Sequence, residues 1–190
     1  LAGVKLDVTG LEHLPMNGRC VLVSNHESYL DGLVLVAALE QPHTFVAKLE
    51  LQAQFVAWRF LKSLGAAFVE RFDRRRSVAD AEQMTSRVKD GAPLLVFPEG
   101  TFVAAPGTLP FRLGAFLAAA HAGVPVIPVS LGGTRQLLGD RRWWPRKADL
   151  SVRIGAPLTV PEPTDPFVAA VQLRDRARRV IVRGLSDGET

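Results

Sequence analysis

The sequence predicts an α/β fold: a single layered domain with a mostly parallel sheet flanked by helices. Short apolar runs rich in β-branched residues alternate with longer stretches of helical periodicity, as in layered α/β folds. The length of 190 residues fits one domain, because compact domains usually run to about 100–200 residues. An apolar share of 47% and a charged share of 22% are typical of a globular chain.

Seven short apolar runs are predicted as strands, because each is rich in Val, Ile, Leu or Phe and ends near a turn signal. They are residues 4–9, 20–24, 44–47, 67–70, 93–97, 126–131 and 150–154. Five longer stretches have helical periodicity. They are residues 29–39, 52–64, 75–89, 111–121 and 167–182. Residues 157–166 contain four prolines and are predicted to connect the last strand to the last helix.

The last predicted helix has one apolar side, with most of its arginines opposite. The apolar positions are Ala170, Leu173, Ala177, Val180 and Ile181. Two interpretations stand: a solvated basic face above a packed one, or a helix that lies on a membrane surface.

The charge balance favours anionic partners, since 23 Lys and Arg against 19 Asp and Glu give a net charge of +4. Arginines cluster in residues 71–76, in residues 141–147 around Trp143 and Trp144, and in residues 174–179. The chain contains no nucleic-acid recognition motif, so we predict no nucleic-acid partner. Phosphate head groups or a phosphate-bearing cofactor suit the pattern better.

The single cysteine, Cys20, cannot form an internal disulfide. It indicates a reducing compartment or simply a small buried apolar side chain. No window approaches the roughly 20 apolar residues that span a bilayer, so no transmembrane helix is predicted. The sequence starts at Leu1 without a leader, and we expect that upstream residues, with room for a membrane anchor among them, were removed from a longer chain.

Residues 25–31, Asn-His-Glu-Ser-Tyr-Leu-Asp, join a predicted strand to a predicted helix, the kind of turn where active sites collect in α/β sheets. His26 and Asp31 would lie about 140° apart on a regular helix and cannot share a helical face. A His in the turn and an Asp in the first helical turn can still meet, with the carboxylate fixing the ring tautomer. With an ordinary pKa of about 6.5, the His can accept a proton from a substrate hydroxyl. Helix capping is the other interpretation of this pattern.

Two more predicted strands end in residues suited to a binding site. After residues 95–97, Gly100 allows close backbone approach to a ligand, while Glu99 and Thr101 can bind acceptor hydroxyls or orient a basic group. Residues 65–71 deliver Arg71 at a strand end, where a guanidinium can bind a phosphate with two hydrogen bonds. Each feature taken singly is also compatible with a turn or a solvated charge.

These three elements resemble motifs one to three of the glycerolipid acyltransferase family, which includes the lysophosphatidic acid acyltransferases. In chain order, the first reads Asn-His-x4-Asp, the second Gly-x-x-Phe-x-x-Arg and the third Phe-Pro-Glu-Gly-Thr. Residues 124–129, Val-Pro-Val-Ile-Pro-Val, resemble a fourth motif, and residues 111–116 match the segment usual between motifs. The resemblance runs from about residue 10 to residue 157. It implies a glycerolphosphate acyltransferase-like fold, with residues 1–190 as one acyltransferase domain.

The resemblance also implies a reaction. His26, held by Asp31, deprotonates the hydroxyl of a lysophospholipid, most simply 1-acylglycerol-3-phosphate. The resulting alkoxide attacks the thioester of acyl-CoA or acyl carrier protein, with no acyl-enzyme and no further cofactor or metal. The protein would act peripherally at the cytoplasmic side of a membrane. The implied acceptor-binding residues are Arg71, Glu99, Gly100, Thr101, Arg74 and Arg112; the residues that shape the site are Asn25, Ser28 and Pro128. Gly100 and nearby backbone would also help the developing oxyanion.

One departure concerns the acceptor, since the family often continues Phe-Pro-Glu-Gly-Thr with Arg or Ser where this chain has Phe102 and Val103. Either Arg71, Arg74 or Arg112 supplies the phosphate contact, or the acceptor is not lysophosphatidic acid. The pair Trp143 and Trp144 suits an interfacial anchor and equally a packed cover over the domain.

Three rival functions fit the sequence less well. A lipid esterase using Ser24 or Ser28 lacks the Gly-x-Ser-x-Gly elbow. A metal hydrolase lacks clustered ligands, because the four histidines are widely separated. A catalytically silent lipid- or carrier-binding domain would have no physical need for the set His26, Asp31, Arg71 and Glu99.

Overall fold

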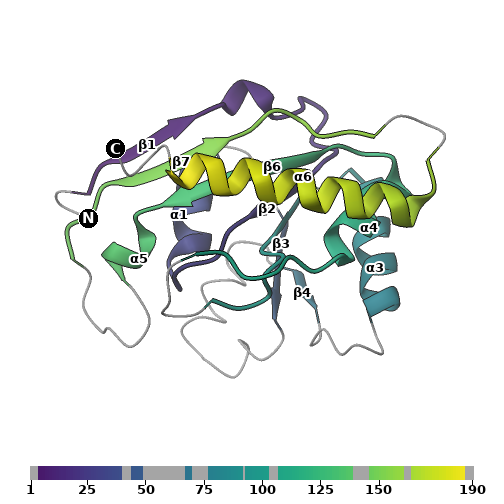
Figure 1. The fold of residues 1–190 in the computed structure, drawn as a ribbon, viewed down its shortest axis with the longest axis horizontal. Coiled ribbons are helices and arrows are strands. Elements are labelled where there is room, and N and C mark those ends of the chain that lie inside the picture. Colours follow the sequence, from purple (N-terminus) through teal and green to yellow (C-terminus); the bar gives the residue numbers. More distant parts are fainter. Residues whose placement is uncertain are drawn as a thin grey trace.

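The computed structural model describes residues 4–39, 44–48, 67–69, 77–91, 93–102, 107–138, 146–160 and 164–186 (Figure 1). Within these residues the chain forms one seven-stranded sheet in the order β1-β7-β6-β2-β5-β3-β4. The strands are β1 (Leu6–Thr9), β2 (Val21–Ser24), β3 (Thr44–Lys48), β4 (Ala67–Val69), β5 (Leu94–Val96), β6 (Val126–Gly132) and β7 (Leu150–Ile154).

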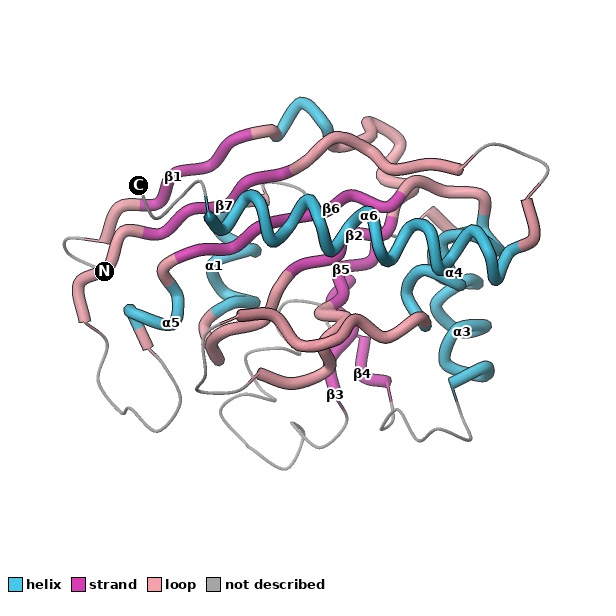
Figure 2. The backbone as a smooth tube through the Cα atoms, in the orientation of Figure 1, coloured by secondary structure: helices cyan, strands magenta, loops and turns pink. Residues whose placement is uncertain are grey.

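The sheet is mostly parallel, as predicted. Among the described strands, β6 and β7 alone pair antiparallel. β2 lies between β5 and β6, with Val23 beside Val96 and Pro128. Because β2 and β5 run in the same direction and end at the same level, the segments that follow Ser24 and Val96 emerge at one edge of the sheet (Figure 2).

Helices cover both faces of the sheet. They are α1 (Asp31–Ala38), α3 (Ser77–Lys89), α4 (Gly114–Ala122), α5 (Thr134–Leu137) and α6 (Pro166–Ser186), with a 3-10 helix at Leu11–His13. In Figure 1, α6 crosses in front of the sheet and α1 lies behind it.

Alternation along β2 explains the two cores. Val21 and Val23 face the side covered by α3, α4 and α6, where they pack with Phe116 and Leu173. Leu22 faces the other side and packs with α1. Successive strand residues point to opposite faces, so a strand that is apolar throughout must be covered twice. Both cores meet at β2, which holds the strand end after Ser24 rigidly.

The predicted elements are largely confirmed. All seven predicted strands are present, and residues 150–154 match β7 at both ends. Four of the five predicted helices are present, while residues 52–64 lie outside the described residues. The 3-10 helix and α5 were not predicted, because elements of three and four residues are too short to show periodicity.

Two other predictions are tested by burial. On α6, Ala170, Leu173, Ala177 and Ile181 are buried, which confirms the apolar side. Cys20 is also buried, and burial raises the pKa of its thiol to about 12. It is therefore a packed apolar side chain.

None of the helices among the described residues is both long enough and apolar enough to cross a bilayer.

Candidate active site

His26 and Asp31 meet as predicted from their spacing. His26 follows β2 in the turn, and Asp31 is the first residue of α1. The ring Nδ1 lies 2.8 Å from Asp31 Oδ2. A carboxylate only accepts, so Nδ1 carries the proton and Nε2 has the lone pair. The His26 side chain is 21% exposed, while Asp31 is fully buried. The pair is thus a base that solvent or substrate can reach, oriented by a buried carboxylate.

The same Asp31 oxygen closes the turn that carries the base. Asp31 Oδ2 accepts the backbone N–H of Glu27 at 2.6 Å and of Ser28 at 3.0 Å. These bonds close the turn that precedes α1, whereas no side chain caps the helix at its N-cap residue, Leu30. The contact with His26 therefore agrees with the orienting interpretation of Asp31, and the helix-capping interpretation is not met.

Asn25 fixes the turn to the neighbouring strand. Its side-chain amide donates to the carbonyl of Leu131 at 2.8 Å, and its Oδ1 accepts the N–H of Leu131 at 2.9 Å. Asn25 is fully buried. The amide therefore substitutes for a backbone strand residue and continues the pairing of β2 with β6 beyond Ser24.

The hydroxyls of Ser24, at the end of β2, and of Ser28, in the turn, both make hydrogen bonds within the protein. The Ser28 hydroxyl donates to the carbonyl of Leu138 and accepts the N–H of Leu30. The Ser24 hydroxyl donates to the carbonyl of Asn25 at 3.1 Å. Both residues are fully buried. Ser28 thus links the turn to Leu138, and neither hydroxyl is presented as a nucleophile for esterase chemistry.

Glu99 joins two loops through backbone groups. Its Oε1 accepts the N–H of His26 at 2.9 Å, and its Oε2 accepts the N–H of Leu109 at 2.5 Å. Burial raises the pKa of the Glu99 carboxyl, and these two hydrogen bonds lower it again in part. Glu99 thus holds the base turn against the loop before α4. Its direct contact with acceptor hydroxyls stays a prediction.

Aromatic rings surround the His26 imidazole. Phe97 stacks on it with ring centroids 4.3 Å apart and an interplanar angle of 19°. Phe102 meets it edge-on at 4.7 Å, and Tyr29 meets Phe102 edge-on at 4.8 Å. Since Asp31 and the two phenylalanines restrict the ring, little rearrangement is needed for Nε2 to act. Phe102 was noted in the sequence for the charge it lacks; its contact with the base was not predicted.

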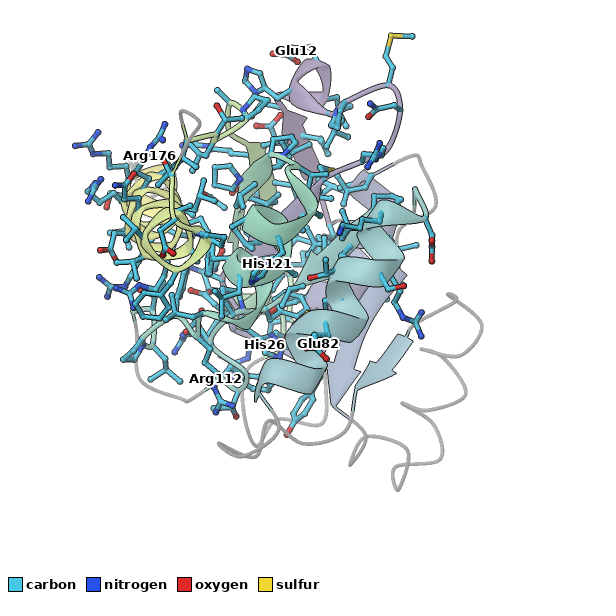
Figure 3. All side chains as sticks on the ribbon, turned by 90° about the vertical axis from the view of Figure 1, so that its right-hand side faces the viewer. Glu12, His26, Glu82, Arg112, His121 and Arg176 are labelled. Carbon is cyan, nitrogen blue, oxygen red and sulfur yellow. The ribbon has the colours of Figure 1, made fainter. Side chains whose placement is uncertain are left out.

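Gly100 and Arg112 lie against each other. Gly100 has a φ of 71°, and a Cβ added there would lie 3.0 Å from both Cζ and Nε of Arg112. The backbone N–H of Arg112 donates to the carbonyl of Pro98. Figure 3 shows Arg112 and His26 at the same end of the molecule, away from Glu12. The Arg112 guanidinium thus lies beside the predicted Gly-containing turn.

The remaining predicted residues have mixed outcomes. The N–H of Gly100 donates to the carbonyl of Phe97 at 3.0 Å, so it is not directed at an oxyanion. Thr101 is exposed. Pro128 is buried in β6, and its carbonyl accepts the N–H of Gly155. Its nitrogen faces the same side, away from β2, so the missing N–H costs no bond to the central strand. Arg71, Arg74, Trp143 and Trp144 lie outside the described residues.

An ion pair beside the base was not predicted from the sequence. Nε of Arg135, on α5, lies 3.8 Å from Oε2 of Glu27. Burial raises the pKa of the Glu27 carboxyl; Arg135 lowers it, and the charges of Asp31 and Glu99 raise it further. The sequence shows only that Glu27 follows the base. It does not indicate that the partner of Glu27 lies 108 positions away, on a helix too short to be predicted from periodicity.

Comparisons with known proteins agree on one family. The family model described as Acyltransferase matches residues 5–132. A chloroplastic 1-acyl-sn-glycerol-3-phosphate acyltransferase of Brassica napus is 38% identical over 135 residues, which are 70% of this chain and 39% of the relative. A 1-acyl-sn-glycerol-3-phosphate acyltransferase of Chlamydomonas reinhardtii is 32% identical over 184 residues, 95% of this chain and 53% of the relative.

A solved structure extends the agreement to the fold. The crystal structure of the 1-acyl-sn-glycerophosphate acyltransferase PlsC from Thermotoga maritima superposes with a TM-score of 0.79 at 28% identity. The match covers 98% of this chain and 73% of that protein. The chain spans about half the length, or less, of the two curated relatives described above.

Proposed function

Because the chain belongs to the acyltransferase family, we propose that it transfers a fatty acyl group from a thioester to the free hydroxyl of a lysophospholipid, specifically 1-acylglycerol-3-phosphate. The donor is acyl-CoA or acyl carrier protein. The observation that carries this proposal is the His26–Asp31 pair, in which the protonated Nδ1 is engaged and Nε2 is the nitrogen that can take a proton. The two relatives described above are named for 1-acyl-sn-glycerol-3-phosphate, which supports the choice of acceptor.

The proposed chemistry is a direct transfer. Nε2 of His26 removes the proton from the acceptor hydroxyl as its oxygen attacks the thioester carbonyl carbon. The carbon–sulfur bond of the tetrahedral intermediate then breaks, and the leaving thiolate receives the proton from the imidazolium. Asp31, buried and 2.8 Å from Nδ1, stabilises that imidazolium between the two steps. No enzyme nucleophile is required, in keeping with the committed hydroxyls of Ser24 and Ser28.

Two arginines are proposed for the acceptor phosphate. Arg112 is supported by its position against Gly100, at the end of the molecule that holds His26 (Figure 3). Arg71 is supported by its motif alone. Guanidinium groups bind phosphate through two parallel hydrogen bonds, which fixes both the position and the orientation of the ligand. Glu99 is proposed to position the base turn, since its oxygens accept two backbone N–H groups.

We also propose that the protein works peripherally on the cytoplasmic face of a membrane. Its acceptor would be an amphiphile that resides in a bilayer, and a net charge of +4 favours anionic lipid surfaces. Sedimentation with anionic and neutral vesicles at low and high salt tests this. Salt-sensitive binding to anionic vesicles is expected, and equal binding to both kinds of vesicle at both salt concentrations would contradict the electrostatic part.

The reaction is tested by thiol release from acyl-CoA with and without 1-acylglycerol-3-phosphate. A transferase needs the acceptor, an esterase releases thiol without it, and a silent binding domain does neither. His26→Ala should lower acceptor-dependent release by about 10²–10⁴-fold. His121→Ala is the matched control, because His121 is exposed on α4. Near-normal turnover in a folded His26→Ala protein would rule out the base.

A further inference from the structure

The turn that carries the base is attached to one short segment of the chain. That segment, residues 131–138, contains the end of β6 and all of α5 (Figure 1). Asn25 exchanges two hydrogen bonds with the backbone of Leu131, at one end of the segment. The Ser28 hydroxyl donates to the carbonyl of Leu138, at the other end. We call this segment the brace, because it binds the turn both before and after the base.

A third contact lies between these two and joins side chains at both ends. Oε2 of Glu27, the residue after the base, lies 3.8 Å from Nε of Arg135. The backbone N–H of Glu27 donates to Asp31 Oδ2, the oxygen that orients the imidazole. Glu27 is thus held by the orienting carboxylate through its backbone and by the brace through its side chain. A shift of Glu27 would therefore move the base relative to its partner.

Stability does not account for this ion pair. The Glu27 side chain is 15% exposed and that of Arg135 23%, so both charges are largely withdrawn from water. Burial raises the pKa of the Glu27 carboxyl although Arg135 lowers it, which means that the ionised form is held in the fold at a net cost. The loss of hydration of two buried charges commonly cancels their attraction. A pair of this kind can still fix one geometry, and here the geometry is that of the turn beside the base.

We propose that Arg135 is a positioning residue for the acyl transfer, which holds the base turn through Glu27 so that Nε2 of His26 meets the acceptor hydroxyl. The inference rests on the proposed transferase function. Arg135 acts through the ion pair and the peptide bond between Glu27 and His26, not through contact with the substrate. A general base must lie about 3 Å from the group it deprotonates, and a displacement of about 1 Å can lower the rate about 10²-fold. Loss of the ion pair should therefore lower kcat and leave the acceptor KM nearly unchanged.

Acceptor titration of Arg135→Gln at saturating acyl-CoA separates the two constants. We expect kcat to fall about ten- to a hundredfold, with little change in acceptor KM. Arg135→Lys should recover part of kcat, because Lys keeps the charge without the planar guanidinium. The matched control is Arg174→Gln, which breaks the ion pair between Arg174 and Asp175 on α6 and should leave kcat unchanged.

Glu27→Gln removes the other half of the ion pair. It keeps the test decisive if Arg135→Gln does not fold, because loss of a carboxylate that is buried at a net cost should not unfold the protein. Its kcat should fall as in Arg135→Gln, and the double variant should match either single variant, since both remove the same contact. Unchanged kcat in either folded variant overturns the inference, and so do effects that multiply in the double variant. A raised acceptor KM with unchanged kcat also overturns it and would make Arg135 an acceptor ligand.

A measurement that needs no activity separates this inference from the proposed function. The N–H groups of Glu27 and Ser28 donate to Asp31 Oδ2, so their hydrogen exchange, followed by NMR, reports whether the turn is held in place. Both should exchange faster in Arg135→Gln than in wild type, and neither should change in Arg174→Gln. Wild type without acceptor-dependent turnover would contradict the proposed function, whereas unchanged exchange in Arg135→Gln would contradict the action of the brace.

Discussion

Asp31 Oδ2 lies 2.8 Å from His26 Nδ1 and accepts, in addition, the backbone N–H groups of Glu27 and Ser28. One buried oxygen thus orients the ring and closes the turn on which the ring is carried. The second oxygen, Oδ1, is buried and makes no hydrogen bond. Because one atom serves both purposes, a substitution that keeps an acceptor in its place can separate the turn geometry from the charge.

Asp31→Asn makes that separation. An Asn with its carbonyl oxygen at the Oδ2 position keeps the three hydrogen bonds and buries its amide where Oδ1 now lies. The uncharged amide cannot stabilise the imidazolium as a carboxylate does, so we expect kcat to fall about 10²–10⁴-fold with little change in acceptor KM. The unpaired buried amide should cost about 1–3 kcal/mol of stability. Steady-state kinetics with urea unfolding measures both, and a raised KM with unchanged kcat would contradict the assignment.

Glu27→Gln should stabilise the protein at neutral pH. Burial, followed by the charges of Asp31 and Glu99, raises the folded-state pKa of Glu27 above its ordinary 4.5, despite Arg135. Between the unfolded and folded pKa values the folded state binds more protons, so the free energy of unfolding falls as pH rises through that window and stays lower above it. Gln cannot ionise and removes this penalty. Below about pH 4.5 the advantage should disappear.

Urea unfolding of wild type and Glu27→Gln at several pH values measures the difference. Glu12→Gln is the control, because Glu12 is exposed in the 3-10 helix. A stability difference for Glu27→Gln that is the same at acidic and neutral pH would show that ionisation of Glu27 is not its source.

The strands of the sheet and the contact between His26 and Asp31 could be predicted from the sequence. Strands such as β2 and β6, which are apolar except for Ser24 and Ser130, can be predicted because burial on both faces selects apolar residues at nearly every position. The His26–Asp31 contact followed from placing one residue in the turn and the other in the first helical turn. What the sequence could not provide are contacts made across the chain. The pairing of Asn25 with Leu131 and of Glu99 with Leu109 depends on backbone groups, which every residue has.

Gly100 and Arg112 should act as one unit on the acceptor. Gly100→Ala adds a Cβ 3.0 Å from the guanidinium and so displaces it. We expect a raised acceptor KM in Gly100→Ala and in Arg112→Ala, and the double variant should match Arg112→Ala alone, because the displaced group is then already absent. Acceptor titration of the four proteins measures the coupling.

Backbone strain is the alternative cause for a Gly100→Ala effect, since its φ of 71° disfavours a side chain. Gly91→Ala controls for it: Gly91 has a φ of 89°, and a Cβ there would meet nothing within 4 Å. Effects of Gly100→Ala and Arg112→Ala that simply add in the double variant would show that the two residues act independently.

Substitution of Arg71 tests whether the acceptor carries a phosphate. It lies outside the described residues, and its role is predicted from its place at the end of the Gly-x-x-Phe-x-x-Arg motif. If its guanidinium binds the acceptor phosphate in ground and transition states alike, Arg71→Ala should raise acceptor KM about ten- to a hundredfold with little change in kcat, because hydrogen bonds to charged groups contribute roughly 1.5–3 kcal/mol. Arg71→Lys should recover only part of the loss, since Lys keeps the charge without the two-pronged geometry. The measurement is acceptor titration at saturating acyl-CoA, run in parallel with a monoacylglycerol that lacks the phosphate; if wild type, Arg71→Lys and Arg71→Ala share one KM for 1-acylglycerol-3-phosphate, the phosphate-bearing acceptor is wrong while the transferase itself stands.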